Sequence, residues 1–180
     1  MQHKIVYNST EYGGAHFYGG FTYENTLNDD TNLQIGNVSC GQLTFATDIQ
    51  FSIGDSFEWN RKIPSASSYS NVGTFIVDSV ETDDYGRYRV VAYDNISKFD
   101  IVVDSYLDSL TWPIAASTLY DGLCTYCGCL PSRVSIANAN YQIPEFTYSN
   151  ITGRALLGYL AQIFGGNIVV FSNGLVRARS

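Results

Sequence analysis

Three closely spaced cysteines are the residues whose types and spacing come nearest to a recognisable chemical site. Cys124, Cys127 and Cys129 form a Cys-x-x-Cys-x-Cys cluster, and Cys40 stands alone. Thiolates at this spacing can share a tetrahedral zinc ion, or two of them can form a disulfide. A structural zinc ion needs four ligands, however, and no histidine lies near the cluster in the sequence.

The residues between the cysteines favour packing over metal binding. Leu119, Leu123 and Tyr126 interleave with the thiols at helical spacing, as in a helix that buries small apolar side chains. We therefore expect reduced, buried, metal-free thiols, with the zinc site and the disulfide as alternatives.

Other residue types that support catalysis lack the partners that catalysis needs. His3 and His16 lie outside any GxSxG or HExxH motif. The acidic pairs Asp29–Asp30 and Asp83–Asp84 could bind calcium or serve a glycosidase, but both lie in expected turns, where Asp forms local hydrogen bonds. The glycine-rich stretch Tyr12–Gly20 lacks the Lys-Ser/Thr of a phosphate loop. We therefore expect no catalytic residue, no cofactor and no metal ligand, and hence no enzyme.

Charge and hydropathy argue against two classes of partner. A formal net charge of -7 opposes binding to nucleic-acid phosphates. The longest apolar runs, such as Ile168–Phe171, are far shorter than the about 20 residues of a membrane span. No apolar signal-peptide core follows Met1. We expect a protein made in a cytoplasm that binds neither nucleic acid nor membrane; the family resemblance described below implies that this cytoplasm is bacterial.

An aromatic stretch near the N-terminus is the candidate interaction surface. It combines six aromatic rings with glycine pairs and very few charges. Aromatic patches of this kind mark interfaces in soluble proteins, and aromatic rings can also stack on the apolar faces of sugars. We expect a self-association interface, with sugar binding and ordinary core packing as alternatives, formed by Tyr7, Tyr12, Phe17, Tyr18, Phe21 and Tyr23.

The elements that position these residues are predicted to be strands as far as residue 103. Leu43 and Phe45 alternate with polar residues, and Ile49–Ile53 continues this period of two. The runs Gly73–Val80 and Tyr88–Tyr93 are rich in β-forming residues and predict a hairpin. We predict that residues 1–103 form a small antiparallel β-barrel or sandwich.

Residues 104–180 are predicted to form a small α+β subdomain with two helices and a terminal β-hairpin. The first helix is expected near 114–128 and the second near 152–164, capped by Asn150 or Thr152. Leu156 and Leu160 fall on the apolar face of the second helix and should be core residues. The predicted fold class is therefore α+β, mainly β.

Several segments, in this order, resemble the central tail-hub proteins of phages and prophages of Gram-positive bacteria. Asp30–Gly36 and the strand Val38–Phe45 are similar to the start of that family, where an NLxxG motif precedes an alternating strand. Gly73–Val77 and Arg89–Asp94 resemble its paired strands, the second of which ends in Ala-Tyr-Asp before a short helix. The resemblance covers about 30–180 and is completed by Leu110–Pro113, Leu123–Cys124, Asn150–Leu157, Gly165–Gly166 and Asn173–Leu175.

The resemblance implies a fold and a role. Such hubs resemble the trimeric hub of contractile-tail baseplates, in which barrels like those of tail-tube proteins form a pseudo-sixfold ring between tube and tip. It implies a non-enzymatic component of a virion tail or prophage-derived particle. Its implied partners are its own copies, in a homotrimer, and other tail or baseplate proteins. The cysteine cluster lies outside the family pattern, which favours the packing interpretation.

Two other functions stay open at this point. One is a carbohydrate-binding β-domain of a surface or receptor-binding protein, suggested by the aromatic stretch. The other is the assembly domain of a tail-associated cell-wall hydrolase whose catalytic part lies outside this sequence.

Overall fold

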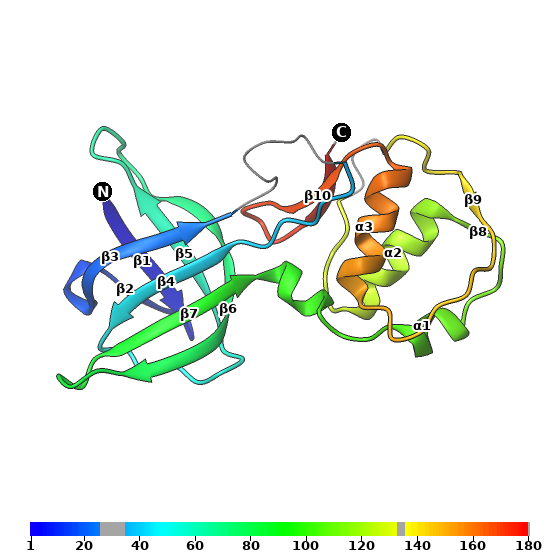
Figure 1. Cartoon of the computed structure of the whole chain (residues 1–180). Helices are drawn as coiled ribbons and strands as arrows, with labels where there is room; N and C mark the ends of the chain where they lie inside the picture. The colour runs from blue at the N-terminus through cyan, green and yellow to red at the C-terminus, as the bar shows by residue number, and fades with distance from the viewer. Residues whose placement is uncertain (26–34, 133–135, 180) are drawn as a thin grey trace. The chain divides into compact units, whose positions relative to one another are not determined.

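The computed structural model describes residues 1–25, 35–132 and 136–179. These residues form two compact units (Figure 1). The first contains Met1–Asn25, Gly41–Asn95 and Phe171–Gly174, and the second contains the described parts of Thr26–Cys40, Ile96–Val170 and Leu175–Ser180.

The first unit is a curled, antiparallel sheet of seven strands that forms a half-barrel. Its strands are β1 (Gln2–Tyr7), β2 (Thr10–Tyr12), β3 (Phe17–Glu24), β4 (Gln42–Thr47), β5 (Ser56–Lys62), β6 (Ser70–Thr82) and β7 (Tyr88–Asp94), and the short 3-10 helix η1 (Gly14–His16) precedes β3. The order across the sheet is β2-β1-β5-β6-β7-β4-β3, which leaves β2 and β3 at its two ends. The predicted barrel-like antiparallel architecture is confirmed.

Alternation of apolar residues explains the core of this sheet. In β4, Leu43, Phe45 and Thr47 are buried while the residues between them are partly exposed, because successive side chains of a strand point to opposite faces. The other strands bury their inward residues in the same way, and together they form a core of Ile5, Leu43, Phe45, Ile49, Phe51, Phe57, Trp59, Phe75, Val77, Val90 and Ala92.

The second unit contains the two predicted helices and the predicted terminal hairpin. Its elements are η2 (Asn95–Phe99), α1 (Asp104–Asp108), β8 (Ile114–Ala115), α2 (Ala116–Tyr126), β9 (Gln142–Ile143), α3 (Gly153–Ile163), β10 (Asn167–Val170) and β11 (Val176–Arg179). α2 starts later than predicted because β8 pairs with β9 just before it. α1 was not predicted, since little more than one turn carries no readable periodicity. No helix among the described residues is long and apolar enough to cross a membrane.

The sequence signals at the two ends of α3 are confirmed in detail. Thr152, rather than Asn150, caps the helix, because its side chain accepts a hydrogen bond from the Ala155 amide at 3.2 Å. Gly165 adopts a positive φ of 67° just beyond the end of the helix, a conformation that suits glycine. Leu156 and Leu160 are buried, as predicted.

A segment between β3 and β4 completes the second unit. Gly36 donates a backbone hydrogen bond to Gly166 at 2.8 Å, and Ser39 donates one to Ile168 at 3.0 Å. Most of the NLxxG motif and the acidic pair at 29–30 lie outside the described residues. The division into a barrel-like domain, 1–103, and an α+β subdomain, 104–180, stays a prediction.

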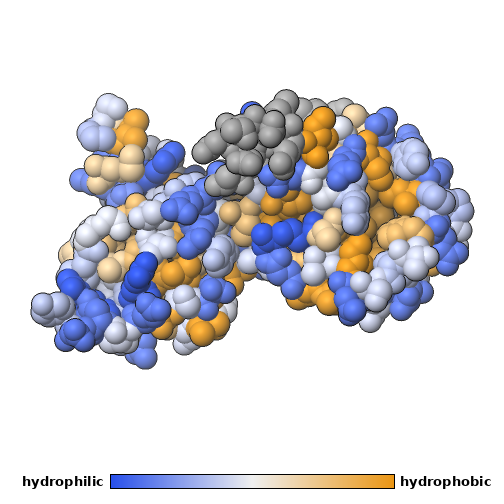
Figure 2. All heavy atoms as spheres, viewed as in Figure 1, coloured by the Kyte–Doolittle hydropathy of each residue, from blue (hydrophilic) through white to orange (hydrophobic). Residues whose placement is uncertain are grey.

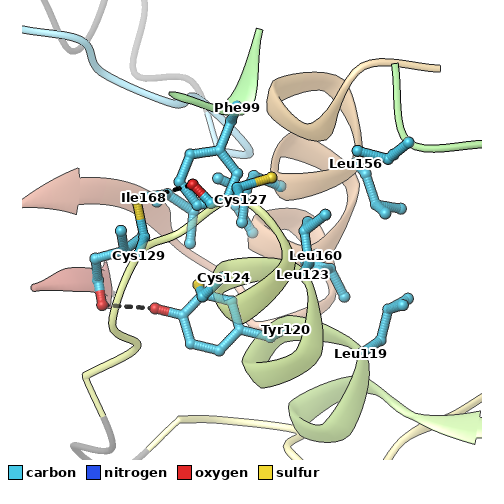
Figure 3. Packing of buried hydrophobic residues seen from close by; sticks show 14 of the residues in the cluster. Phe99, Leu119, Tyr120, Leu123, Cys124, Cys127, Cys129, Leu156, Leu160 and Ile168 are labelled. Atoms are coloured by element: carbon cyan, nitrogen blue, oxygen red, sulfur yellow. Dashed lines mark hydrogen bonds between the residues drawn. The ribbon is translucent and has the colours of Figure 1, made fainter. Parts of the chain in front are cut away.

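The cysteine cluster lies in the core of the second unit (Figure 3). Cys124, Cys127 and Cys129 are buried and not joined in disulfides. Burial raises the pKa of the Cys127 thiol to about 11 and raises the pKa of Cys124 well above its ordinary range. A side chain on Gly153 would come within 3.3 Å of the Cys127 sulfur, so the start of α3 packs closely on this thiol. The predicted burial is confirmed, and the absence of metal stays a prediction.

We predict that the three clustered thiols are unreactive in the folded protein, because buried, protonated thiols are poor nucleophiles. A Cys40→Ser variant should show negligible labelling by a thiol-specific aromatic disulfide at neutral pH. Three equivalents should react after unfolding in guanidinium chloride. Rapid labelling in the folded state, or one equivalent of zinc retained through chelator-free purification, would contradict this interpretation.

Candidate functional site

The structure places the six aromatic residues of the predicted interface on strands β1, β2 and β3. Four of them, Tyr7, Tyr12, Phe17 and Phe21, are partly buried and pack against the core of the sheet. Tyr18 and Tyr23 are each 38% exposed. Core packing, one of the alternatives considered from the sequence, therefore accounts for part of this stretch.

Phe21 joins the end strand β3 to the inner face of the curled sheet. Its ring stacks on Phe45 at 5.0 Å between centroids and on Trp59 at 5.7 Å. It also stacks on the His3 ring at 4.3 Å. Trp59 and His3 belong to β5 and β1, which are not neighbours of β3 in the sheet order. Stacked side chains therefore link β3 to β1 and β5, with which it shares no strand pairing.

A bulge in β3 allows Phe21 to reach this position. Tyr18 pairs with Ala46 and Thr22 pairs with Thr44, so β3 advances four residues while β4 advances two. Gly19 lies in the bulge with a φ of 78°, which a residue with a side chain adopts rarely. The glycine pair at 19–20 thus serves to orient Phe21.

The outer edge of β3 is open to a partner strand. β3 ends the sheet order, so no described strand pairs with its outer side. Gly20 and Thr22 are exposed there, and Glu24 at the end of the strand is its one charged residue. Sheet edges are templates for pairing unless charges, proline or bulges block them. The bulge between Tyr18 and Thr22 lies in this strand, so Thr22–Glu24 is the regular part of the edge.

His3 is held in its neutral form within the aromatic cluster. The Trp59 Nε1 group donates a hydrogen bond to His3 Nδ1 at 3.2 Å, which requires an unprotonated Nδ1. Burial, the N-terminal amino group and Arg61 together lower the pKa of His3, burial contributing most. His3 therefore packs as an aromatic ring and accepts one hydrogen bond.

His16 lies in a hollow lined by Tyr7, Tyr12, Asp48 and Gln50, among others. His16 Nδ1 lies 2.9 Å from Asp48 Oδ1, and both side chains are exposed. Within the described residues, no Ser, Thr or Cys side chain is hydrogen-bonded to either histidine ring. The pair therefore has no attached nucleophile of the kind that hydrolases use.

Potential metal ligands are dispersed over the described residues. No group of three or more His, Cys, Asp or Glu side chains there could hold a metal ion. The acidic pair at 83–84 includes Asp83, whose carboxylate accepts bonds from the Arg87 amide and Nε group, and this holds the pKa of Asp83 below its usual value. Asp83 is therefore a turn residue that forms local hydrogen bonds, as predicted from the sequence.

The fold is similar to that of three solved tail proteins, although no family model and no curated protein sequence matches the chain. They are the prophage MuSo2 43 kDa tail protein from Shewanella oneidensis (TM-score 0.65, 15% identity), the tail protein from Neisseria meningitidis MC58 (0.67, 12%) and the prophage tail protein gp18 from Listeria monocytogenes EGD-e (0.58, 12%). Each similarity covers 98% of this chain and 53%, 49% and 50% of those proteins, respectively. The chain thus spans about half the length of the structures it matches, and at these identities the likeness is one of fold.

We predict that the stability of the first unit falls as the pH is lowered through the range below about 6.5. The unfolded chain binds a proton at His3 near that pH, whereas the folded state, with its lowered His3 pKa, resists protonation. His3→Gln should flatten this dependence, measured as the free energy of unfolding between about pH 7 and 5. His16→Gln, which leaves the Trp59 contact intact, should retain it. Equal slopes for wild type and His3→Gln would refute the prediction.

We also predict that the chain does not hydrolyse peptidoglycan, because neither histidine has a bonded nucleophile among the described residues. A suspension of purified bacterial cell walls should keep its turbidity when the protein is added. Clearing of the suspension that His16→Ala abolishes would show that the prediction is wrong.

Proposed function

We propose that this chain is a non-enzymatic structural component of a phage-type tail, acting at the baseplate or tail-tip hub. The observation that carries the proposal is the similarity of nearly the whole chain to three tail proteins. The order of motifs in the sequence, which resembles that of central hub proteins, supports the same role. The chain then belongs in a virion tail or prophage-derived particle.

We propose further that the chain acts by self-association, as three copies in a ring, and by contacts with other tail proteins. The open edge of β3 supports this part, because its outer side has exposed backbone and one terminal charge in a protein of net charge -7. A neighbouring copy that pairs with this edge would satisfy its backbone groups and shield it from uncontrolled aggregation. Tyr18, exposed beside the edge, would add apolar contact area.

Sugar binding is a second candidate function, and one observation favours it. The hollow at Tyr7, Tyr12 and His16 combines aromatic rings with the Asp48 carboxylate, a combination that suits stacking on a sugar and bonding its hydroxyls. A glycan array should distinguish the two functions. Binding that Asp48→Asn and Tyr12→Ala abolish, in a protein that stays monomeric, would favour a carbohydrate-binding domain.

The third candidate function is the assembly domain of a cell-wall hydrolase. In that case too, this chain would act through contacts with other chains and not as the enzyme. That function would place the catalytic groups in another segment or another protein. The self-association test below therefore applies to it equally, and a lytic activity found only in a longer protein would separate it from a hub.

We predict that the protein forms species larger than a monomer at high micromolar concentration. Positive charges introduced on the β3 edge should prevent this association. Gly20→Lys with Thr22→Lys should give a monomer in sedimentation equilibrium, because lysines on an edge repel a second strand. Deleting 1–23 would be a poor test, since it removes the buried Ile5 with β1.

The matched control is Ser56→Lys with Thr82→Lys, which adds the same charge at exposed positions on the interior strands β5 and β6. This variant should associate like the wild type. A wild-type protein that is strictly monomeric at the highest soluble concentration, or equal loss of association in both variants, would remove the β3 edge as the interface.

A further inference from the structure

The second unit, called the helical unit below, has a large apolar groove, and none of its lining residues belongs to the aromatic stretch. Its volume is about 820 Å³, and it is bounded by α3 and the segment that follows β9. Figure 2 shows hydrophobic residues gathered on this part of the helical unit. Phe146 and Tyr148 contribute from the segment after β9, and Ala155, Tyr159 and Ile163 contribute from α3.

The lining of the groove is uncharged, whereas the chain carries a net charge of -7. Leu156 and Leu160 are buried side chains that also belong to it. Tyr141 and Tyr159 remain 54% and 56% exposed at its margins. An apolar hollow bordered by exposed tyrosines is typical of a binding surface, because tyrosine contacts apolar and polar groups alike.

The segment 144–149 presents unpaired backbone along this groove. It has no regular secondary structure, and within the described residues no backbone–backbone hydrogen bond involves it. Before it, β9 is fixed by pairing with β8. After it, the Asp104 carboxylate accepts hydrogen bonds from the amides of Asn150 and Ile151 at 2.7 and 3.0 Å. The segment is thus anchored at both ends and unpaired between them.

Three carboxylates lie near Tyr148, which belongs to this segment. The Tyr148 hydroxyl donates a hydrogen bond to Asp108 at 2.6 Å. That hydrogen bond, burial and the negative charges of Asp108, Asp104 and Glu145 together raise the pKa of Tyr148 to about 12. Glu145 is exposed and has no ion-pair partner among the described residues. One margin of the apolar groove is therefore negative.

We propose that the groove binds an extended segment of another protein chain, which pairs as a strand with 144–149 and carries a lysine or arginine beside apolar side chains. The unpaired backbone favours strand addition, since main-chain hydrogen bonds supply affinity and alternate side chains enter the pocket. The uncharged lining selects apolar side chains, and Asp108 with Glu145 selects the cation. The inference concerns a surface of the helical unit and does not depend on the β3 edge.

The test uses a synthetic, capped eight-residue peptide that alternates leucine and threonine and begins with lysine. Titrated into the isotopically labelled protein, it should shift the amide signals of 145–149, Ala155 and Tyr159 in nuclear magnetic resonance spectra. The amides of 145–149 that pair with it should also exchange more slowly with solvent. A peptide with glutamate in place of lysine should bind about tenfold more weakly, and Glu145→Gln should reduce that difference.

Two variants locate the site. Ala155→Trp, at an exposed position of α3 within the groove, should fill the hollow and weaken binding at least about tenfold. Thr118→Trp, at an exposed position of α2 outside the groove, should bind like the wild type. Tyr159→Ala, which removes an exposed ring, serves if Ala155→Trp fails to fold.

Each other result overturns the proposal. Absence of binding, or binding that neither groove variant weakens, would exclude strand addition at this site. Equal shifts caused by N-acetyl-leucine amide, without slower exchange at 145–149, would indicate a pocket for small apolar molecules. Shifts of the groove signals with protein concentration alone would assign the groove to a second copy of this chain.

Discussion

The first unit depends on the position of the Phe21 ring. The sheet is a half-barrel, so backbone hydrogen bonds do not close it, and its end strand β3 pairs with β4 alone. Phe21 stacks on Phe45, Trp59 and His3, from three other strands. Aromatic contacts contribute beyond simple burial, so this cluster supplies part of the cohesion that a closed barrel obtains from pairing. Because the half-barrel is not closed by strand pairing, β3 has a free edge, and the aromatic rings inside the sheet hold that strand in place.

The second unit depends on close packing around buried sulfur. Cys124, Cys127 and Cys129 occupy core positions, and Gly153 lets the start of α3 approach Cys127. Protein interiors are packed at crystal-like density, so residues of this size fix the separation of the elements. The thiols therefore act as small apolar groups, and the groove opens on α3 beside this core rather than at the cysteines.

The uncharged surfaces of this protein suggest how it interacts. Charged residues make up only 15% of the sequence, so much of the surface must be uncharged. The β3 edge has one terminal charge and the groove lining has none. Such surfaces are suited to main-chain pairing and apolar contact, the interactions by which protein assemblies are built. This is consistent with the proposed structural role in a tail.

The sequence alone determined the elements whose signals are local. Period-two alternation marked β4, and the candidate caps Asn150 and Thr152 with the glycines after α3 marked that helix, because these patterns follow from the geometry of a single strand or helix. Helical spacing was also sufficient to predict the burial of the cysteine cluster. The tertiary structure alone decided which rings of the aromatic stretch pack inward, since that depends on a bulge and on partners more than 15 residues away, such as Trp59. It likewise decided that 35–40 joins the helical unit and that 144–149 faces a groove, because both depend on contacts between segments far apart in the chain.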